Sequence, residues 1–575
     1  MYDIFLSIDE NTKLEELEKI VRYNIGKANI LREKIKELDK VEMLTEKRSN
    51  EIKEIQKEEE VDSEEIEEEE YIYYYRNMKK EIKKATNQEE IIDAILDTLP
   101  SCENKSYSSI VNRIKLELLK EIHQRGMKLV MDLVVNHTSD QHRWFQEGTS
   151  GQNPAYRDYY IWETEKPNRW GSWFGGSAWE YNTQAGAHYL HIFAKKQPDL
   201  NWQNPTLRDE IYRMMSWWLN KGIDGFRMDV ISLISKPDPI PRDTGSDLSP
   251  YCINGPQVHT YLKEMRQKVL AKYDIMTVGE CPGITVQEAQ KYAGTDSGEL
   301  NMVFQFEHTS LTDGKYGKWS ADRTDLVKLK EVLNRWQNGL RETSWNCLFW
   351  GNHDQPRAVS KFGCDLPEYR VLSAKMLCAC LYLMQGTPYI YQGEEIGMPN
   401  PHFTSLEQYR DIESICAYHD FVDSGVVEKR MMLTLLAHTS RDNARTPMQW
   451  NSRFCAGFSS APPWISLGYS WRAVNVEQEE KDENSVLHFY RDILAFRKGN
   501  PLIRYGTFEL LCADDPHIFA YVRTYQGKRL LVICNFSEKS QNAAAIYPNP
   551  EAIRFHNYPS ITPAVLRPFE LIAAL

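Results

Sequence analysis

The chain has 575 residues, enough for several domains around a large buried core. Its formal net charge of -13 argues against nucleic acid or an anionic membrane surface as a partner. No apolar run reaches the roughly 18 residues that a membrane-spanning helix needs, and the first residues lack the features of a secretory signal. Eleven cysteines, scattered from Cys102 to Cys534, indicate reduced thiols in a cytoplasmic protein rather than a disulfide framework.

Residues 1–110 differ in texture from the rest of the chain. Apolar residues recur at helical spacing from Leu14 to Leu38, which predicts one long amphipathic helix. An acidic tract and a cluster of tyrosines follow, and then more charged helical sequence. We interpret this segment as a charged helical arm. Two interpretations remain open: an interaction surface, or a solvated helical hairpin with an acidic turn.

From about residue 112, apolar runs that end in polar residues alternate with helical patterns. Such repeated βα units predict a (β/α)8-type TIM barrel with its site at the C-terminal ends of the strands. The segments 208–219 and 374–383 are two of the helices expected between the strands. The runs expected to form strands are 128–137, 225–231, 275–280, 302–306, 346–354 and 387–395.

Two segments interrupt or follow this pattern. Residues 139–202 are rich in glycine and aromatic residues and predict an inserted domain B, with some aromatics in its core and others at a pocket rim. The barrel would then comprise residues 111–138 and 203–500. After residue 500 the helical pattern stops, and residues 501–575 predict a C-terminal antiparallel β-sandwich. Its strands are expected within 508–511, 517–522, 530–534 and 571–575.

Acids and their partners stand at the ends of several expected strands. Arg227 and Asp229 are two residues apart, so that they share one face of a strand. A buried aspartate beside an arginine stays ionised, either as a nucleophile or as half of a structural salt bridge. Two carboxylates about 5 Å apart can serve as nucleophile and general acid in retaining glycoside hydrolysis, and a third can stabilise the transition state. Asp132, Glu280 and Asp354 are the further acids that a barrel would bring to the same pocket.

From about residue 112 to the C-terminus, the chain resembles the α-amylase superfamily, glycoside hydrolase family 13. Within that superfamily it is most similar to the oligo-1,6-glucosidase and α-glucosidase branch. The motifs that carry the resemblance are DLVVNH (132–137), QPDLNW (197–202), GFRMDV (225–230), VGE (278–280), NHDQPR (352–357) and SRDNARTPMQW (440–450).

The resemblance implies a role for each matching residue. Asp229 would be the nucleophile, Glu280 the general acid and then base, and Asp354 the residue that grips sugar hydroxyls and stabilises the transition state. The residues expected to hold the sugar of the non-reducing end are His137, Phe193, Gln197, Arg227 and His353, with one of Arg441 and Arg445, and Arg445 is the favoured one. The partner expected is a small oligosaccharide, with no cofactor; the oligomeric state stays open.

Substrate preference rests on Val230 and on the QPDLN motif. In this family, valine directly after the nucleophile accompanies cleavage of α-1,6 bonds, whereas small or hydroxyl residues accompany α-1,4 cleavage. The alternative is that a β-branched residue simply suits a strand. The function expected is that of a retaining α-glucosidase that releases glucose from the non-reducing end of short α-1,6-linked gluco-oligosaccharides.

The sequence departs from the family at the N-terminal side. The first two barrel strands, a calcium loop and a Gly-Tyr-Asp motif are not found, so the sequence predicts six barrel strands and no metal ion. An incomplete barrel exposes two sheet edges. The arm could cover the gap, the chain could result from fusion or truncation, or another chain could pair with it. Two alternatives to the main function are a catalytically impaired interaction or scaffold protein and a transglycosylase or sucrose isomerase.

Overall fold

The computed structural model describes residues 117–575, and Lys128–Leu575 form one compact unit. The predictions for the arm, residues 1–110, lie outside the described residues. Residues 117–124 are helical. Between residues 117 and 575, no helix is both long and apolar enough to cross a membrane.

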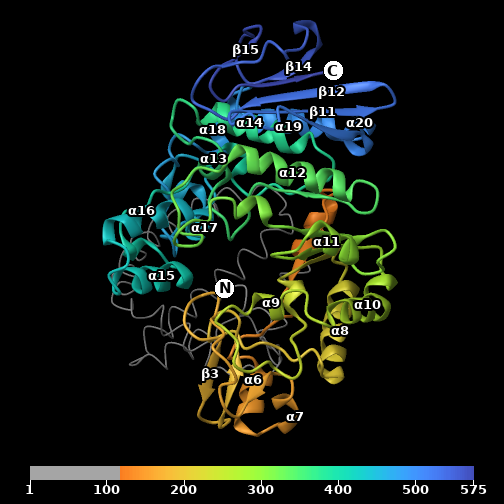
Figure 1. Cartoon of the computed structure of the whole chain (residues 1–575), viewed down its shortest axis with the longest axis vertical. Coiled ribbons are helices and arrows are strands. Elements are labelled where there is room, and N and C mark those ends of the chain that lie inside the picture. Colours follow the sequence, from red (N-terminus) through yellow and green to blue (C-terminus); the bar gives the residue numbers. More distant parts are fainter. Residues whose placement is uncertain (1–116) are drawn as a thin grey trace, which may run out of the picture. The chain divides into compact units, whose positions relative to one another are not determined.

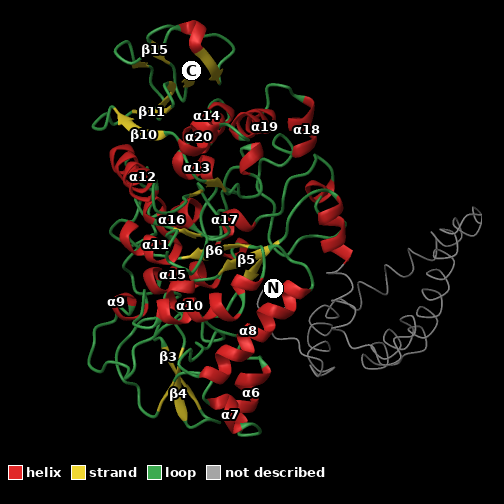
Figure 2. Ribbon diagram, turned by 90° about the vertical axis from the view of Figure 1, so that its right-hand side faces the viewer, coloured by secondary structure: helices red, strands yellow, loops and turns green. Residues whose placement is uncertain are grey.

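Short parallel strands form the middle of the compact unit, with helices around them (Figures 1 and 2). Four of the strands make one sheet in the order β1-β5-β6-β7, and β8 pairs in parallel with β9. They span Val130–Leu133 (β1), Gly225–Met228 (β5), Met276–Glu280 (β6), Met302–Phe304 (β7), Cys347–Leu348 (β8) and Thr387–Pro388 (β9). All six lie inside the predicted runs. They are shorter than those runs because the polar residues at the C-terminal ends belong to the loops that follow.

The start and the end of β5 have identifiable physical causes. Gly225 begins the strand with φ 157°, and a Cβ at this position would lie 1.9 Å from the carbonyl oxygen of Met276 on β6. Only glycine permits this close approach of the two strands. The strand ends before Val230, whose φ of 34° turns the chain into the 3₁₀ turn η2 (Ile231–Leu233). The strand predicted over 225–231 is therefore cut short by a backbone conformation that valine rarely adopts.

Helices separate the strands as βα units require. Asn204 caps α8 (Pro205–Asn220) by accepting hydrogen bonds from the N–H groups of Thr206 and Leu207. Thr285 and Glu288 form a reciprocal capping box at the start of α11 (Val286–Ala293). The other helices of this part include α10 (Val258–Lys268), α12 (Leu326–Leu340), α13 (Ala358–Phe362), α14 (Arg370–Tyr382), α15 (Ile412–Val422), α16 (Lys429–Thr439), α17 (Asp442–Arg445), α18 (Val476–Lys481) and α19 (Val486–Arg497).

The segment between β1 and α8 folds as a small unit of its own. Its antiparallel sheet has the order β2-β4-β3, with β2 at Trp162–Glu163, β3 at Trp179–Asn182 and β4 at Ala187–Leu190. The helices α6 (Arg143–Ser150) and α7 (Pro154–Arg157) lie beside this sheet at the bottom of Figure 1. Trp170 and Trp179 are buried in its core, whereas Tyr181 is 52% exposed. Some of the aromatic residues thus belong to the core of this unit, as expected, whereas the pocket rim expected for the others stays a prediction.

The C-terminal residues form an antiparallel sheet in the order β10-β11-β12-β16-β14 and a separate β13-β15 pair. The strands are β10 (Thr507–Leu511), β11 (Ile518–Tyr525), β12 (Lys528–Asn535), β13 (Gln541–Asn542), β14 (Ile553–His556), β15 (Val565–Leu566) and β16 (Leu571–Ala574). A short helix, α20 (Pro501–Tyr505), precedes them, so helical structure does not end at residue 500. Buried Arg523 on β11 donates to the carbonyl oxygens of Leu383, Ile503, Gly506 and Thr507 and so attaches the sheet to the end of α14.

Candidate active site

Arg227 on β5 holds three carboxylates from three neighbouring strands. Its Nη1 donates to Asp132 Oδ1 at 2.9 Å and to Asp229 Oδ1 at 2.6 Å, and its Nη2 donates to Glu280 Oε2 at 2.6 Å. Asp132 lies on β1, Asp229 directly follows β5, and Glu280 ends β6. Parallel strands in register bring these residues together, because β1 pairs with β5 and β5 with β6.

Glu280 is buried, with 7% of its surface exposed. Burial raises the pKa of this carboxyl to about 8; the charge of Arg227 opposes the rise, and the charges of Asp229 and Asp354 add to it. Glu280 therefore carries a proton at neutral pH. A carboxyl group with a proton to donate, beside the partly exposed Asp229, is the pairing that general acid catalysis requires.

Val230 adopts a strained backbone conformation directly after Asp229. Its φ of 34° lies in the left-handed region, where a β-branched residue is an outlier. The same conformation directs its N–H to Glu280 Oε2, at 3.1 Å. The side chain is buried in a cluster with Phe193 and Leu233. Strain of this kind, held by surrounding contacts, is typical of functional sites.

Asp354 lies in the loop after β8 and is surrounded by positive charge. Its Oδ1 accepts from Arg445 Nη2 at 2.6 Å and from Arg441 Nη1 at 3.2 Å, and His353 Nε2 lies 3.1 Å from Oδ2. Burial alone would raise the pKa of Asp354, but the hydrogen bond and charge of His353 and the two arginines hold it well below its usual range. The same contact raises the pKa of His353 against the effect of burial. Both arginines therefore contact this acid, whereas the sequence favoured Arg445 alone as the one at the sugar.

His137 contacts Phe193 and Gln197, which belong to the segment 139–202, called domain B here. The amide nitrogen of Gln197 is 2.9 Å from His137 Nε2, and the ring of Phe193 is centred 5.3 Å from the imidazole. On the other side of the ring, the amide nitrogen of Asn136 is 3.2 Å from His137 Nδ1. The orientation of His137 is thus set from both sides.

Asn136 belongs to a buried ionic network that attaches domain B to the barrel. Lys236 Nζ donates to Asn136 Oδ1 at 2.6 Å and lies 2.8 Å from Asp199 Oδ1. Asp199 also accepts from Asn136 Nδ2 at 2.7 Å and from the N–H of Ile192 at 2.6 Å. The side chain of Lys236 is 3% exposed and that of Asp199 is fully buried. The sequence analysis did not single out Lys236. A lysine directly after the mostly apolar run 230–235 is a pattern that could have indicated it.

We expect Lys236→Met to destabilise the protein and to weaken substrate binding. Removal of one partner from a buried ion pair costs about 3–5 kcal/mol, because the other charge stays buried without compensation. Here that charge is Asp199, and the displaced Asn136 no longer orients His137. Urea unfolding should show a lower midpoint, and KM should rise more than kcat falls. The double variant Lys236→Met/Asp199→Asn should regain part of the lost stability; no recovery would contradict this interpretation.

Further residues that the sequence did not single out surround Arg441. Arg441 Nη2 donates to Asp411 Oδ1, and its Nε lies 3.1 Å from Glu413 Oε2. Its guanidinium carbon is 4.5 Å from the centre of the Phe174 ring of domain B. Lys318 Nζ donates to the same Glu413 oxygen at 2.7 Å. The sequence signal that could have indicated these residues is a pair of acids at the start of α15. Asp411 lies immediately before this helix and Glu413 lies in its first turn.

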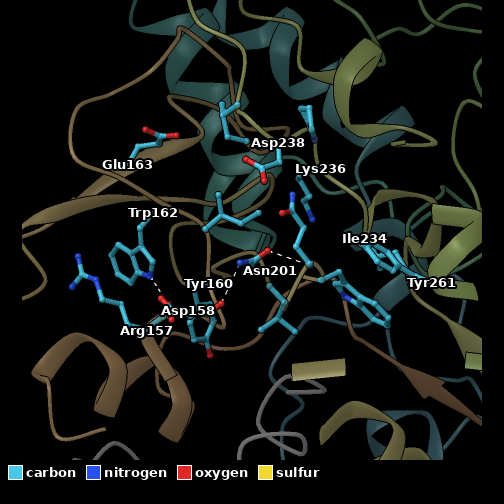
Figure 3. Close-up of a pocket in the computed structure, with 16 residues that line it drawn as sticks. Arg157, Asp158, Tyr160, Trp162, Glu163, Asn201, Ile234, Lys236, Asp238 and Tyr261 are labelled. Atoms are coloured by element: carbon cyan, nitrogen blue, oxygen red, sulfur yellow. Dashed lines mark hydrogen bonds between the residues drawn. The ribbon is translucent and has the colours of Figure 1, made fainter. Parts of the chain in front are cut away.

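A polar crevice of about 310 Å³ lies elsewhere, between domain B and the loop 234–240 (Figure 3). Arg157, Trp162 and Asn201 line it, together with Lys236 and Asp238 (Figure 3). None of the site residues predicted from the sequence lines this crevice. The guanidinium of Arg157 covers one face of Trp162, and Phe145 stacks on the same indole with ring centroids 5.8 Å apart. We therefore place the chemistry at Arg227 and its acids and not in this crevice.

Residues 117–575 contain no group of three or more His, Cys, Asp or Glu side chains placed to hold a metal ion.

Parallel strands that carry three acids and an arginine at their C-terminal ends define a glycoside hydrolase of the carboxylate type. The sequence pattern of the family "Alpha amylase, catalytic domain" matches residues 112–506. The chain belongs to this family, and it carries the catalytic domain of glycoside hydrolase family 13.

Relatives within the family are close. The oligo-1,6-glucosidase of Halalkalibacterium halodurans is 52% identical over 429 residues, which are 73% of this chain and 76% of that protein. The α-glucosidase of Pediococcus pentosaceus is 48% identical over 79% of this chain and 84% of its own length. Among solved structures, trehalose-6-phosphate hydrolase of Bacillus licheniformis superimposes with a TM-score of 0.74 at 39% identity, over 83% of this chain and 90% of that one.

Proposed function

We propose that the chain is a retaining α-glucosidase that hydrolyses short α-1,6-linked gluco-oligosaccharides from the non-reducing end. The observation that carries the proposal is the guanidinium of Arg227, which contacts both Asp229 and Glu280 at 2.6 Å. One guanidinium that holds both acids keeps them near each other. Retaining enzymes need a carboxyl separation of about 5 Å, whereas inverting enzymes leave room for a water molecule.

In this mechanism Asp229 attacks the anomeric carbon while Glu280 gives its proton to the departing glycosidic oxygen. The products of this step are a glucosyl-enzyme ester on Asp229 and the shortened sugar. Glu280, now ionised, then takes a proton from water, which attacks the anomeric carbon and releases glucose with retained configuration. Asp354, ionised because of its arginine and histidine neighbours, stabilises the positive charge that develops on the sugar ring.

The residues around these acids would bind the glucose unit of the non-reducing end. His137, Gln197 and His353 supply hydrogen-bonding groups, and Phe193 supplies an aromatic surface behind His137. Arg441 and Arg445 supply charge that holds Asp354 in its ionised form, and Arg227 donates hydrogen bonds to the acids around it. Asp229 and Asp354 are 20% and 27% exposed and are thus accessible to a sugar.

The names of the relatives and Val230 favour α-1,6-linked glucosides. A phosphorylated glucoside is the second candidate, because some relatives are named trehalose-6-phosphate hydrolase. A phosphate needs cations that are not already neutralised. Arg441 is paired with Asp354, Asp411 and Glu413, and Lys318 is paired with Glu413. This neutralisation disfavours a phosphate at this position.

The test is release of glucose by the purified chain from isomaltose, maltose, trehalose 6-phosphate and sucrose, with product analysis by chromatography. The proposal predicts the highest kcat/KM on isomaltose and simple hydrolysis products. Preferred cleavage of trehalose 6-phosphate, or isomerised products from sucrose, would replace it by the corresponding alternative. A folded protein without turnover would favour a non-catalytic role.

Val230→Thr should shift the preference toward maltose. Threonine keeps the β-branch and the volume, so the strained backbone at this position survives, but its hydroxyl brings a polar group to the pocket wall. We expect the ratio of kcat/KM for isomaltose over maltose to fall about tenfold, equal to about 1.4 kcal/mol of discrimination. Val230→Ile, which stays apolar, is the matched control. An unchanged ratio in Val230→Thr would show that Val230 serves the backbone alone.

We also propose the domain division expected from the sequence, with barrel residues 111–138 and 203–500, domain B 139–202 and a C-terminal domain 501–575. The separate sheets within these ranges support this division.

We also propose that the barrel is incomplete. Among the described strands, β1 pairs only with β5 and β9 only with β8. Hydrogen exchange at β1 and β9 tests it, because amides at an open edge exchange faster than those of β5 and β6.

A further inference from the structure

Lys361 connects two of the loops that surround the catalytic acids. It lies on α13, and its Nζ donates to the carbonyl oxygen of Thr309 at 2.5 Å and to Gln355 Oε1 at 2.9 Å. Thr309 ends the 3₁₀ turn η4 (Glu307–Thr309) after β7, whereas Gln355 belongs to the loop after β8. One ammonium group thus ties the ends of two successive barrel strands.

Gln355 directly follows Asp354 in a tight turn. The N–H of Asp354 donates to Asn352 Oδ1 at 2.8 Å, and the N–H of Gln355 donates to the carbonyl oxygen of Asn352 at 3.3 Å. The backbone between Asn352 and Gln355 therefore has little freedom of its own, and a displacement of Gln355 moves Asp354. The arginines hold the carboxylate from one side, and Lys361 holds the following residue from the other.

The surroundings of Lys361 are unusual for a lysine. Both hydrogen-bond acceptors are neutral carbonyl oxygens rather than carboxylates. The charged or titratable groups that face it, Asp313, Lys318 and His308, all come from the segment after β7. Burial lowers the pKa of Lys361 to about 7, with Asp313 opposing the shift and Lys318 adding to it. A desolvated cation without an ion-pair partner at hydrogen-bond distance is unfavourable for folding, which points to a role in the geometry of the site.

We propose that Lys361 is a positioning residue, which fixes the orientation of Asp354 by tying Gln355 to the turn after β7. The inference rests on the proposed function, since it assigns Asp354 its effect on the transition state. Lys361 acts through Gln355 and does not touch the sugar. Its loss should therefore lower kcat while KM changes little, because a displaced Asp354 stabilises the transition state less well.

The experiment compares Lys361→Met, Lys361→Arg and the control Lys328→Met, an exposed lysine on α12. With isomaltose, we expect Lys361→Met to lose about tenfold in kcat with KM within twofold, as a misplaced catalytic group predicts. Lys361→Arg should restore most of the activity, because a guanidinium can donate to both carbonyl oxygens. Circular dichroism and thermal melting establish that each variant is folded. A rise in KM with unchanged kcat would overturn the proposal and make Lys361 a substrate contact.

The pH profile supplies a readout that a purely structural lysine would not move. The neutral amine of Lys361 donates weaker hydrogen bonds than the ammonium, so kcat of the wild type should begin to fall near pH 7. Arginine stays charged, so Lys361→Arg should lack this step and keep only the decline near pH 8 set by Glu280. Identical profiles for the wild type and Lys361→Arg would refute the proposal.

Failure of the proposed function can be told from failure of this inference. Binding of the glucose-shaped imino sugar 1-deoxynojirimycin, measured by calorimetry, needs no turnover. Lys361→Met should weaken its binding about tenfold, since the protonated imino sugar carries the positive charge of the transition state that Asp354 stabilises, and Lys361→Arg should not. Unchanged binding in Lys361→Met would overturn the positioning role whether or not the wild type hydrolyses isomaltose.

Discussion

Asp229→Asn is expected to abolish the hydrolysis of isomaltose, with kcat lower by about 10⁴-fold or more, the size of loss seen when a covalent nucleophile is removed. Asparagine has the shape of aspartate, and its amide oxygen can still accept from Arg227 Nη1, which lies 2.6 Å from Asp229 Oδ1. The amide oxygen, however, is a very poor nucleophile and carries no charge to stabilise the oxocarbenium-like transition state. Substrate binding should survive, because the sugar contacts of His137, His353 and Asp354 are untouched.

Glucose release under single-turnover conditions measures this loss, and calorimetry with isomaltose measures binding to the inactive variant. The matched control is Asp209→Asn, a half-exposed acid on α8 that pairs with Lys268 on α10 and not with Arg227. It should retain wild-type kcat. An Asp229→Asn variant with more than a few per cent of wild-type kcat would assign the nucleophile to another acid, and Asp132 would be the first to test.

Glu280→Gln is expected to lower kcat on isomaltose by about 10³-fold, within the range of general acid catalysis. Glutamine cannot give a proton to the departing sugar oxygen. The leaving group of a 4-nitrophenyl glucoside is a stabilised phenolate that needs no protonation. The first step on this substrate should therefore be much less affected. The second step then limits turnover, because no base activates water, and azide should restore the rate by attacking the glucosyl-enzyme directly. Equal losses in kcat/KM, which reports the first step alone, on both substrates would contradict the assignment of Glu280 as the acid.

The pH dependence provides a second measurement on the same residue. Glu280 has a pKa of about 8, so it is protonated at pH 7, and kcat/KM should fall as the pH rises through 8. The raised pKa also means that its contribution to stability is fully present below about pH 4, the value of an unfolded glutamate, and is lost as the pH rises through 8. Glu280→Gln removes this titration, so the stability of the variant should depend less on pH between about pH 4 and pH 8.

The positions of the strands along the chain could be predicted from the sequence, and so could the acids that we propose as catalytic. Apolar runs that end in Asp, Glu or His occur at the spacing of βα units, and parallel strands bring their C-terminal ends to one edge of the sheet. For this reason Arg227, Asp229 and Glu280 were expected to lie together, and the structure places both acids within hydrogen-bond distance of Arg227. Domain B and the C-terminal sheet were predicted for a similar reason, since local periodicity and turn residues mark their boundaries.

Contacts between distant segments could not be predicted in this way. Arg441 and Arg445 both reach Asp354, although the sequence singled out one of them, because α17 presents both guanidinium groups to the loop after β8. The pairing of Lys236 with Asp199 joins residues far apart in the chain, and no local pattern indicates it. The left-handed backbone of Val230 contradicts the local preference of valine for extended structure and ends β5 early.

The sequence by itself determined the family, the three acids that we propose as catalytic and the alternation of strands and helices, because these depend on local patterns of polarity and on motifs of a few residues. Only the tertiary structure decided which arginine or lysine holds which acid, and thus which acid carries a proton at neutral pH. The pKa of Glu280 rises and that of Asp354 falls, although desolvation by itself would raise the pKa of both carboxyl groups. The difference arises from desolvation and from neighbouring charges, which depend on distances that the chain acquires only when it folds.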